Sequence, residues 1–306
     1  MKHFSVLLEE AVTGLQIKPT GLYIDATLGG GGHAEAILSH LTTGHLLGFD
    51  QDPFAIHQAQ DRLARFTNIT YIPTNFQHLK TECSARGISH VDGILMDIGV
   101  SSFQLDDPER GFSYHHDASL DMRMNPAQET SAATLLATYS KEQLKDMFTK
   151  GEVPFTNRLV EEILSVRPHQ PITTTMELVE LVKRAAPRVE KQKRHPARLV
   201  FQALRMETND ELGVLERTIH DALSMLTVGG RCAIITFHSL EDRIVKQAFQ
   251  KASSLDIPKG VPIATKGMRA PFQLITKKPI VPTDQELKLN SRSKSAKLRV
   301  IERIHD

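Results

Sequence analysis

The chain has 306 residues, with 37 Lys and Arg against 36 Asp and Glu, so its net charge of +1 identifies no class of partner. That length is enough for two domains. Cys83 and Cys232 lie far apart without metal-ligand spacing, so we expect both to pack as small apolar residues and expect no metal site. With no signal peptide and no apolar run long enough to span a membrane, the sequence predicts a soluble cytoplasmic protein.

A glycine-rich turn follows the first predicted strand. After an amphipathic helix over residues 6–15, a strand over 21–26 breaks into four glycines at 29–32, and a helical pattern starts near Ala34. Glycines let the backbone turn sharply and let a ligand approach main-chain N–H groups. The start of the next helix favours an anionic group. The spacing fits the loose G-x-G-x-x-G/A pattern, which alone is weak evidence for a nucleotide site.

An acidic residue ends the second predicted strand. This strand covers residues 45–49, and Asp50 follows it, 21 positions after Gly29. A carboxylate at that distance suits two hydrogen bonds to ribose hydroxyls. The alternative is a surface turn beside a solvated aspartate.

The alternation of strand and helix continues through the first hundred residues. The further elements are a helix at 53–66, a strand at 69–72, a helix at 76–85 and a strand at 91–96. Such alternation predicts a parallel sheet with helices on both faces and a ligand at the carboxyl ends of the strands. Asp25, Asp50 and Asp97 all fall at such ends.

The alternation then stops. We predict three segments: core 1–105, an inserted helical domain 106–205 and core 206–306. The middle segment has no good strand pattern. Ser140 with Gln143, and Thr174 with Glu177, have the spacing of helix capping boxes.

The core pattern resumes after the insertion. A long helix is predicted over about 198–226, then a strand over 231–237 and a helix that opens at Ser239. Two further strands, 272–276 and 298–304, are joined by a polar stretch too short for a crossover helix. We therefore expect a closing hairpin, with one strand antiparallel to the rest.

Six motifs together resemble a known family. They are YIDATLGGGGH (23–33), GILMDIGVSS (93–102), QLDD (104–107), RGFS (110–113), DMRM (121–124) and FHSLEDR (237–243). In this order they resemble the MraW family of S-adenosylmethionine-dependent methyltransferases of small-subunit ribosomal RNA. The resemblance implies an α/β, Rossmann-like methyltransferase: a mostly parallel sheet with a closing antiparallel hairpin, plus an inserted helical domain for substrate recognition. It also implies that the target is the exocyclic N4 amine of a decoding-region cytidine in 16S RNA. We expect the RNA to be bound within the assembled small subunit, and free RNA stays open as the alternative substrate.

The resemblance also implies which residues hold the cofactor, S-adenosyl-L-methionine. Gly31, Gly32 and His33 hold its methionine end, Asp50 its ribose, Phe76 lies near the adenine, and Asp97 and Gln104 complete the pocket. Main-chain N–H groups suit a carboxylate, a carboxylate suits a diol or an ammonium, and an aromatic face suits a purine. From the residues alone, core packing is favoured for Phe76, and His33 could merely cap a helix.

The catalytic group stays open. An exocyclic amine is a poor nucleophile, so an acceptor for its protons would help the reaction. Many amino-methyltransferases carry D/N/S-P-P-Y/F after the fourth strand, whereas segment 97–102 here has no proline. Asp97 is the side-chain candidate, and a backbone carbonyl just after it is the alternative. His238, Ser239 and Asp242 resemble a hydrolase triad by composition only, and a structural or substrate-loop role is favoured.

The insertion carries a run of positive charge. Between Lys183 and Arg205 there are eight basic residues and a single acidic one, Glu190. We predict that this run binds ribosomal RNA phosphates, and a merely solvated face is the alternative. Two other functions remain open: a nicotinamide-dependent dehydrogenase and a non-catalytic RNA-binding or assembly protein. The oligomeric state, a homodimer included, also stays open.

Overall fold

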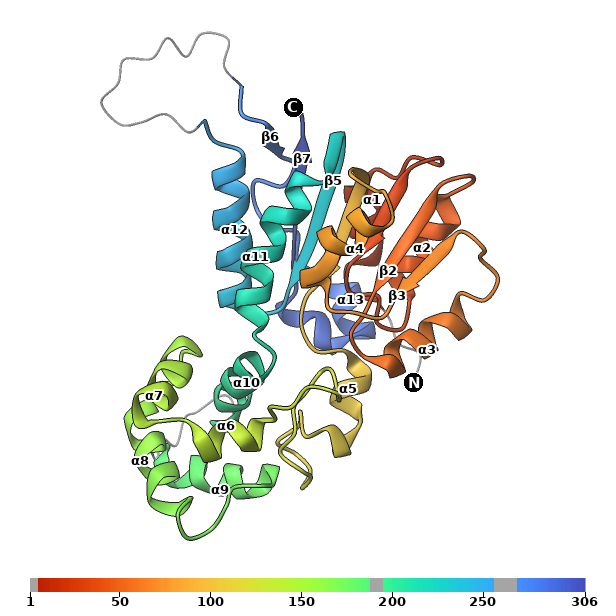
Figure 1. The fold of residues 1–306 in the computed structure, drawn as a ribbon. Coiled ribbons are helices and arrows are strands. Elements are labelled where there is room, and N and C mark those ends of the chain that lie inside the picture. Colours follow the sequence, from red (N-terminus) through yellow and green to blue (C-terminus); the bar gives the residue numbers. More distant parts are fainter. Residues whose placement is uncertain (1–4, 188–194, 256–268, 306) are drawn as a thin grey trace, which may run out of the picture. The chain divides into compact units, whose positions relative to one another are not determined.

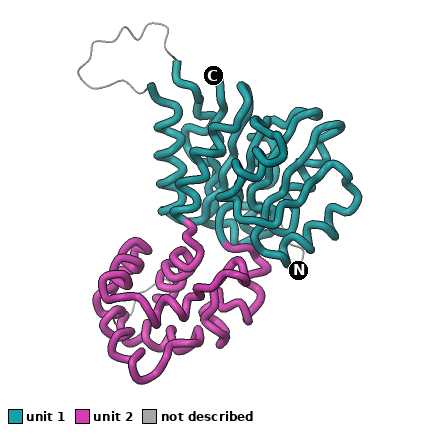
Figure 2. Tube along the Cα trace, in the orientation of Figure 1, with its two compact units in different colours: residues 1–99, 212–306 teal, residues 100–211 magenta. Residues whose placement is uncertain are grey.

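Two compact units make up the chain (Figure 2). The structure, a computed structural model, describes residues 5–187, 195–255 and 269–305. The core unit comprises Met1–Gly99 and Leu212–Asp306, and the helical unit comprises Val100–Glu211. The helical unit is slightly wider than the predicted insertion of 106–205.

The core unit is built around a seven-stranded sheet with the order β3-β2-β1-β4-β5-β7-β6 (Figure 1). The strands are β1 (Leu22–Asp25), β2 (His45–Phe49), β3 (Ile69–Ile72), β4 (Val91–Asp97), β5 (Leu226–Thr236), β6 (Phe272–Leu274) and β7 (Lys297–Arg303). The first five strands run parallel, in the order of a doubly wound nucleotide-binding sheet. β7 is antiparallel to both β5 and β6, so the predicted closing hairpin is confirmed.

Helices cover both faces of this sheet. They are α1 (Leu8–Leu15), α2 (Gly32–His40), α3 (Pro53–Arg62), α4 (Leu79–Ala85), α11 (Glu211–Ser224) and α12 (Ser239–Ala252), whereas α13 (Asp284–Leu289) lies in the connection between β6 and β7 and buries no residue. Tyr23 and Leu95 pack with α1, α2 and α3 in one apolar core, whereas the adjacent Ile24 and Ile94 pack with α4, α11 and α12 in another. Consecutive strand residues point to opposite faces, so a sheet covered on both sides needs strands that are apolar throughout.

The predicted long helix over 198–226 is wrong, because the structure has two helices there. α10 (Ala197–Thr208) ends before Asn209, and Asp210 has a left-handed φ of 47° before α11 begins. The buried Asn209 amide donates to the Met122 carbonyl at 2.8 Å and accepts from the Met124 N–H at 2.8 Å. These hydrogen bonds to the loop that contains Met122 and Met124 fix the Asn209 side chain at the point where the helix is interrupted.

Smaller differences affect three other elements. The predicted helix over 53–66 ends at Arg62, and the one over 76–85 begins as a 3-10 turn, Phe76–His78. The connection between the last two strands contains α13 and a second 3-10 turn, Ser291–Ser295. Neither is a crossover helix, because the strands they join are antiparallel.

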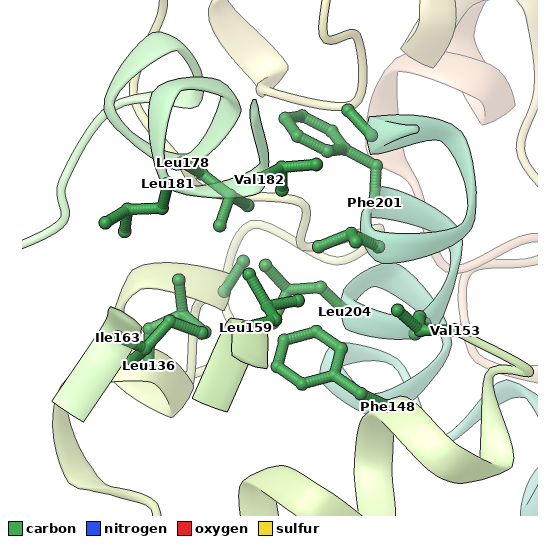
Figure 3. Close-up of a cluster of buried hydrophobic side chains, with 14 of the residues drawn as sticks. Leu136, Phe148, Val153, Leu159, Ile163, Leu178, Leu181, Val182, Phe201 and Leu204 are labelled. Carbon is green, nitrogen blue, oxygen red and sulfur yellow. The ribbon is translucent and has the colours of Figure 1, made fainter. Parts of the chain in front are cut away.

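The helical unit packs short helices around one apolar core, part of which is drawn in Figure 3. The helices are α5 (Ser102–Asp106), α6 (Ala132–Thr138), α7 (Lys141–Lys150), α8 (Thr156–Val166), α9 (Thr175–Ala185) and α10. Both predicted capping boxes are confirmed at the starts of α7 and α9. Within its described residues the unit has no strand, only an isolated bridge between Ser119 and Thr174.

The motifs RGFS and DMRM lie in an irregular loop of the helical unit that hydrogen bonds hold in shape. Arg123 forms an ion pair with Asp121 at 2.7 Å, and Arg110 donates to the carbonyls of Arg123 and Met124. Met122, between these groups, has a φ of 58°. Left-handed backbone is uncommon for a residue with a side chain. The surrounding side-chain bonds are what hold it there.

Both cysteines are free and buried, as expected. Burial raises the pKa of Cys83 to about 11 and that of Cys232 to about 12, so both are thiols at neutral pH. In the part of the chain that the structure describes, no helix is long and apolar enough to cross a membrane.

Candidate functional site

The glycine turn between β1 and α2 is open to a ligand at its first residue. Gly29 and Gly31 have φ values of 50° and 77°, in the left-handed region that favours glycine. A Cβ added to Gly29 would meet only the Thr27 carbonyl, at 3.9 Å, among the described atoms. The backbone there is therefore accessible, at the carboxyl end of the central strand β1.

The other side of the turn is filled by the chain itself. A Cβ on Gly31 would lie 3.1 Å from Leu63, and one on Gly32 would collide with the Ser5 hydroxyl. Gly32 is the first residue of α2 and needs no left-handed φ. Sequence reasoning missed this role of Ser5. The two predicted glycines therefore provide main-chain groups and close packing, while the open approach lies at Gly29.

The segment around Ser5 is fastened beside the turn by two hydrogen bonds. The carbonyl of Val6 accepts from His33 Nε2 at 3.0 Å, and the N–H of Leu7 donates to Glu286 of α13 at 2.9 Å. His33 does not cap α2, whose N-cap residue is Gly31; its buried ring connects this segment to the carboxyl edge of the sheet.

Asp50 supports the glycine turn from the end of β2. Its Oδ2 accepts from the N–H of Gly29 at 2.8 Å, and its Oδ1 accepts from the N–H of Asp52 at 2.9 Å. Burial, opposed by these hydrogen bonds, raises the pKa of Asp50 to about 6. The sequence spacing thus corresponds to a direct contact, and at neutral pH the carboxylate is available to hydroxyl donors.

Phe76 follows β3 at the same edge of the sheet. It begins the 3-10 turn before α4 and is half-buried against the core that contains Leu79. The Asn75 side-chain amide donates to Gln51 Oε1 at 2.9 Å, which joins this loop to the residue after Asp50. Phe76 thus packs against the core and retains an exposed portion close to the Asp50 loop.

Asp97, at the end of β4, has an unsatisfied acceptor. Its N–H donates to Thr27 Oγ1 at 2.6 Å, and its Oδ2 lies 3.7 Å from His33 Nδ1. No described residue forms a hydrogen bond with the buried Oδ1. A buried acceptor without a donor is costly, and such groups often mark a binding site.

Two further carboxyl groups surround Asp97. Asp25, at the end of β1, is 1% exposed, and its Oδ2 has no hydrogen-bond partner among the described residues. Burial, together with the charges of Asp25 and Glu241, raises the pKa of Asp97 to about 8. Burial raises the pKa of Asp25 to about 7. Near neutral pH, Asp97 therefore carries a proton in much of the unbound protein, and a bound cation would displace it.

The unbound protein is expected to lose stability as the pH rises from about 5 to 8. Carboxyls of an unfolded chain titrate near pH 4, whereas Asp25, Asp50 and Asp97 keep protons to about pH 7, 6 and 8. The folded state binds more protons in this range, so the stability these groups contribute is complete below about pH 4 and disappears as the pH rises through their folded pKa values. Urea unfolding at pH 5 and pH 8 should show a smaller loss of unfolding free energy for Asp97→Asn than for the wild type. An equal loss would contradict the assignment.

The FHSLEDR motif builds the start of α12. Glu241 accepts from the N–H groups of Phe237 and His238 at 2.7 and 3.2 Å, and its Oε1 lies 2.9 Å from His238 Nε2. α12 begins at Ser239, as predicted, and His238 is its N-cap residue. Sequence reasoning missed Glu241 beside Asp97, although its spacing from His238 is that of a capping box.

Asp242 of the same motif forms ion pairs with β7. It pairs with Arg299 at 2.7 Å and Lys297 at 2.9 Å, which fastens α12 to β7. These ion pairs hold the pKa of Asp242 below its usual range despite burial. His238 pairs with Glu241 and Asp242 with basic residues, so the residues do not form a hydrolase triad. The favoured structural role is the one observed.

Gln104 lies in the helical unit, at the third position of α5. Its Oε1 accepts from the N–H of Ser101 at 3.1 Å, and its own N–H donates to Ser101 Oγ at 3.2 Å. The side chain is buried and completes a capping box. Its predicted contact with a cofactor stays a prediction.

The six other predicted site residues all lie at the carboxyl edge of the parallel strands in the core unit. Gly31, Gly32 and His33 follow β1, Asp50 follows β2, Phe76 follows β3 and Asp97 ends β4. This edge combines a glycine turn, the N-terminus of a nine-residue helix, a carboxylate and two buried acids with raised pKa values. It suits a ligand that carries a carboxylate, a cation and a diol.

The chain is similar to several known proteins. The model of the MraW methylase family matches residues 1–304. A protein of Limosilactobacillus fermentum named ribosomal RNA small subunit methyltransferase H is 50% identical, over 99% of this chain and 98% of its own length. One of the same name from Streptococcus dysgalactiae subsp. equisimilis is 49% identical over the same shares. The crystal structure of an rRNA methylase from Streptococcus thermophilus is 11% identical, with a TM-score of 0.44, over 100% of this chain and 99% of that one.

Proposed function

This chain belongs to the MraW methylase family, and from that premise we propose that it transfers a methyl group from S-adenosyl-L-methionine to ribosomal RNA. The acceptor is the exocyclic N4 amine of a decoding-region cytidine in 16S RNA within the assembled small subunit, and the reaction takes place in the cytoplasm. The observation that carries this proposal is the unpaired, buried Asp97 Oδ1 beside the glycine turn that Asp50 supports.

The residues at the carboxyl edge fit this methyl donor. The main-chain N–H groups of Gly32 and His33, at the positive end of α2, suit its carboxylate, whereas the N–H of Gly31 already donates to the Leu28 carbonyl at 2.8 Å. Asp50 Oδ1 and Oδ2 suit the two ribose hydroxyls, and the exposed part of Phe76 suits the adenine. Asp97 suits the ammonium group, because the cation would satisfy Oδ1 and favour loss of the proton that burial retains.

The donor supplies a methyl group on a positively charged sulfur, so the protein contributes position and electrostatics. The amine must lose a proton as it gains the methyl group. Asp97 is the candidate acceptor of that proton, and a carbonyl just after it is the alternative. Burial, together with the negative charges of Asp25 and Glu241, raises the pKa of Asp97. A carboxylate with a raised pKa is a stronger base.

Asp97→Asn separates these two roles. If Asp97 pairs with the ammonium group, calorimetry should show weaker donor binding in the variant, together with a loss of the proton release that accompanies binding near pH 8. If Asp97 accepts the amine proton, single-turnover methyl transfer should slow while donor affinity is unchanged. A variant that matches the wild type in both measurements removes Asp97 from the site.

The basic run of the helical unit is proposed to bind RNA phosphates. Arg188, Lys191, Lys193 and Arg194 lie outside the described residues. Among the described members, Arg205 is only partly exposed and pairs with Glu211 at 2.8 Å, so we do not propose it as a phosphate contact. Lys183 and Arg184 are about half-exposed and pair with single glutamates at the surface.

Changing Lys191, Lys193 and Arg194 together to Ala should weaken binding to small subunits with a reduced dependence on salt. Each lost phosphate contact lowers the slope of log affinity against log salt by roughly 0.7–0.9, so the slope should fall by about 2. Filter binding across a salt series measures this, and the dissociation constant of the donor serves as the control. An unaltered slope would show that the run is only a solvated face.

The proposed function is tested by methyl transfer from labelled S-adenosyl-L-methionine to unmethylated small subunits. Nucleoside analysis should find the label in N4-methylcytidine. Free 16S RNA should be a poorer substrate than the assembled subunit, and NAD should not raise the melting temperature whereas S-adenosyl-L-methionine should. Label at another base would refute the proposed target, and binding without transfer would favour an assembly protein.

A further inference from the structure

Three aromatic rings form a column in the helical unit that runs from its core to its surface. Phe201 of α10 is 4% exposed, Tyr114 is half-buried and His195 is exposed. The ring centroids of Tyr114 and Phe201 are 5.6 Å apart, edge to face, and those of Tyr114 and His195 are 5.0 Å apart at an interplanar angle of 12°. The outermost ring is therefore a flat surface on a rigid base.

The orientation of the His195 ring is set by the backbone. Its Nδ1 accepts from the N–H of Ala197 at 3.2 Å, at the start of α10. Desolvation of the part of the ring that Tyr114 covers, together with the nearby His115 and Lys183, lowers the pKa of His195, so the neutral imidazole is favoured at physiological pH. The neutral tautomer then carries its proton on Nε2, the ring nitrogen that this bond leaves available as a donor.

Apolar packing alone does not explain this column. A histidine held for packing would be covered, whereas His195 and the neighbouring His115, whose ring lies 4.4 Å from Tyr114, are both exposed. Single-stranded RNA is commonly bound by stacking unpaired bases on such rings, and every base has a face that can stack. The half-exposed Lys183 lies near enough to influence the pKa of His195 and adds positive charge for a nucleic acid.

We propose that the exposed face of His195, supported by Tyr114, is a stacking site for an unpaired nucleobase of the RNA substrate. The proposal rests on the proposed function, because it assumes an RNA substrate. The neutral ring adds stacking energy and a donor at Nε2, and it leaves phosphate binding to the basic residues. Extruding a cytidine from folded RNA costs about a few kcal/mol, and a stacked base next to it would offset part of that cost.

Two substitutions separate stacking from a purely structural role. His195→Asn retains an acceptor for the Ala197 N–H but has no ring, because Asn caps its own backbone two residues on. His195→Phe retains a ring for the base but loses the cap. His116→Ala is the matched control, an exposed histidine in the loop of Tyr114 for which the described residues show no ring contact.

The measurements are the dissociation constant for small subunits and the KM and kcat of methyl transfer. His195→Asn should weaken binding by about 5- to 150-fold, the usual range for loss of one stacked base, with no change in the salt slope. His195→Phe and His116→Ala should remain close to the wild type, and all three should bind the methyl donor normally. The proposal would be overturned if His195→Asn bound small subunits normally while His195→Phe bound them weakly. It would also be overturned if the two variants bound small subunits with the same affinity.

Failure of the stacking site and failure of the proposed function give different results. If the wild type methylates small subunits and His195→Asn does so equally well, only the stacking site is wrong. If the wild type neither binds nor methylates them, the RNA substrate is wrong, and the stacking proposal falls with it.

Discussion

Asp242→Ala is expected to destabilise the core unit by about 3–5 kcal/mol, because it leaves two buried or partly buried cations without a partner. Arg299 is 7% exposed and its Nε lies 2.7 Å from Asp242 Oδ1, while Lys297 Nζ lies 2.9 Å from Oδ2. Truncating Asp242 leaves the positive charges of Arg299 and Lys297 without a partner, at positions where water cannot fully solvate them. Urea unfolding of the full chain measures the change.

Two further variants test the cause of this loss. Asp242→Leu combined with Arg299→Met removes both buried charges and should recover part of the stability, since apolar replacements of a buried pair are often neutral. Glu180→Ala breaks the exposed pair with Lys183 and should change stability by less than about 1 kcal/mol. If Asp242→Ala cost no more than Glu180→Ala, the motif would not fasten α12 to β7.

Asp50→Ala should weaken donor binding by roughly 10- to 150-fold, because a hydrogen bond to a charged acceptor contributes about 1.5–3 kcal/mol. The variant loses the ribose contacts proposed above and also the bond from Asp50 to the Gly29 N–H. Since the pKa of Asp50 is raised to about 6, donor affinity should also fall as the pH drops below that value. Isothermal calorimetry at pH 5 and 7.5 measures both effects.

A matched control for Asp50→Ala is Asp61→Ala, which removes an exposed carboxylate in α3 from the same unit. It should leave the affinity unchanged. Asp50→Asn, which keeps an acceptor for the Gly29 N–H, should lie between the wild type and Asp50→Ala. Unchanged affinity in a folded Asp50→Ala protein would remove Asp50 from the donor site.

Much of the fold was predictable because its causes are local. The strand His45–Phe49 and the strand Ile69–Ile72 have the bounds that their apolar runs predict. The capping boxes at α7 and α9 depend on residues three positions apart, which one turn of helix always brings together. The position of Asp50 was predictable for a similar reason, since parallel strands end at one edge and carry their terminal residues with them.

The chemistry of the site was less predictable, because it depends on contacts between distant residues. The residue types at positions 25, 50 and 97 indicate a polar edge, but nothing local indicates that Asp97 retains a proton. That follows from burial beside Asp25 and Glu241, which meet only when β1, β4 and α12 are assembled. Similarly, the spacing of the glycines does not reveal that the Ser5 hydroxyl fills the space above Gly32.

The sequence by itself thus determined the parallel part of the sheet, the glycine turn, the position of Asp50 at the end of a strand and the existence of a helical insertion. These features depend on periodicity and on short-range spacing, which can be read along the chain. Only the tertiary structure decided where a continuous helical pattern breaks and which side chains share an environment. The break at Asn209 comes from its bonds to Met122 and Met124, and the ring column comes from the meeting of Tyr114 with His195. Such pairs are far apart in the sequence, and the free energy that selects them comes from burial and hydrogen bonding in the folded state.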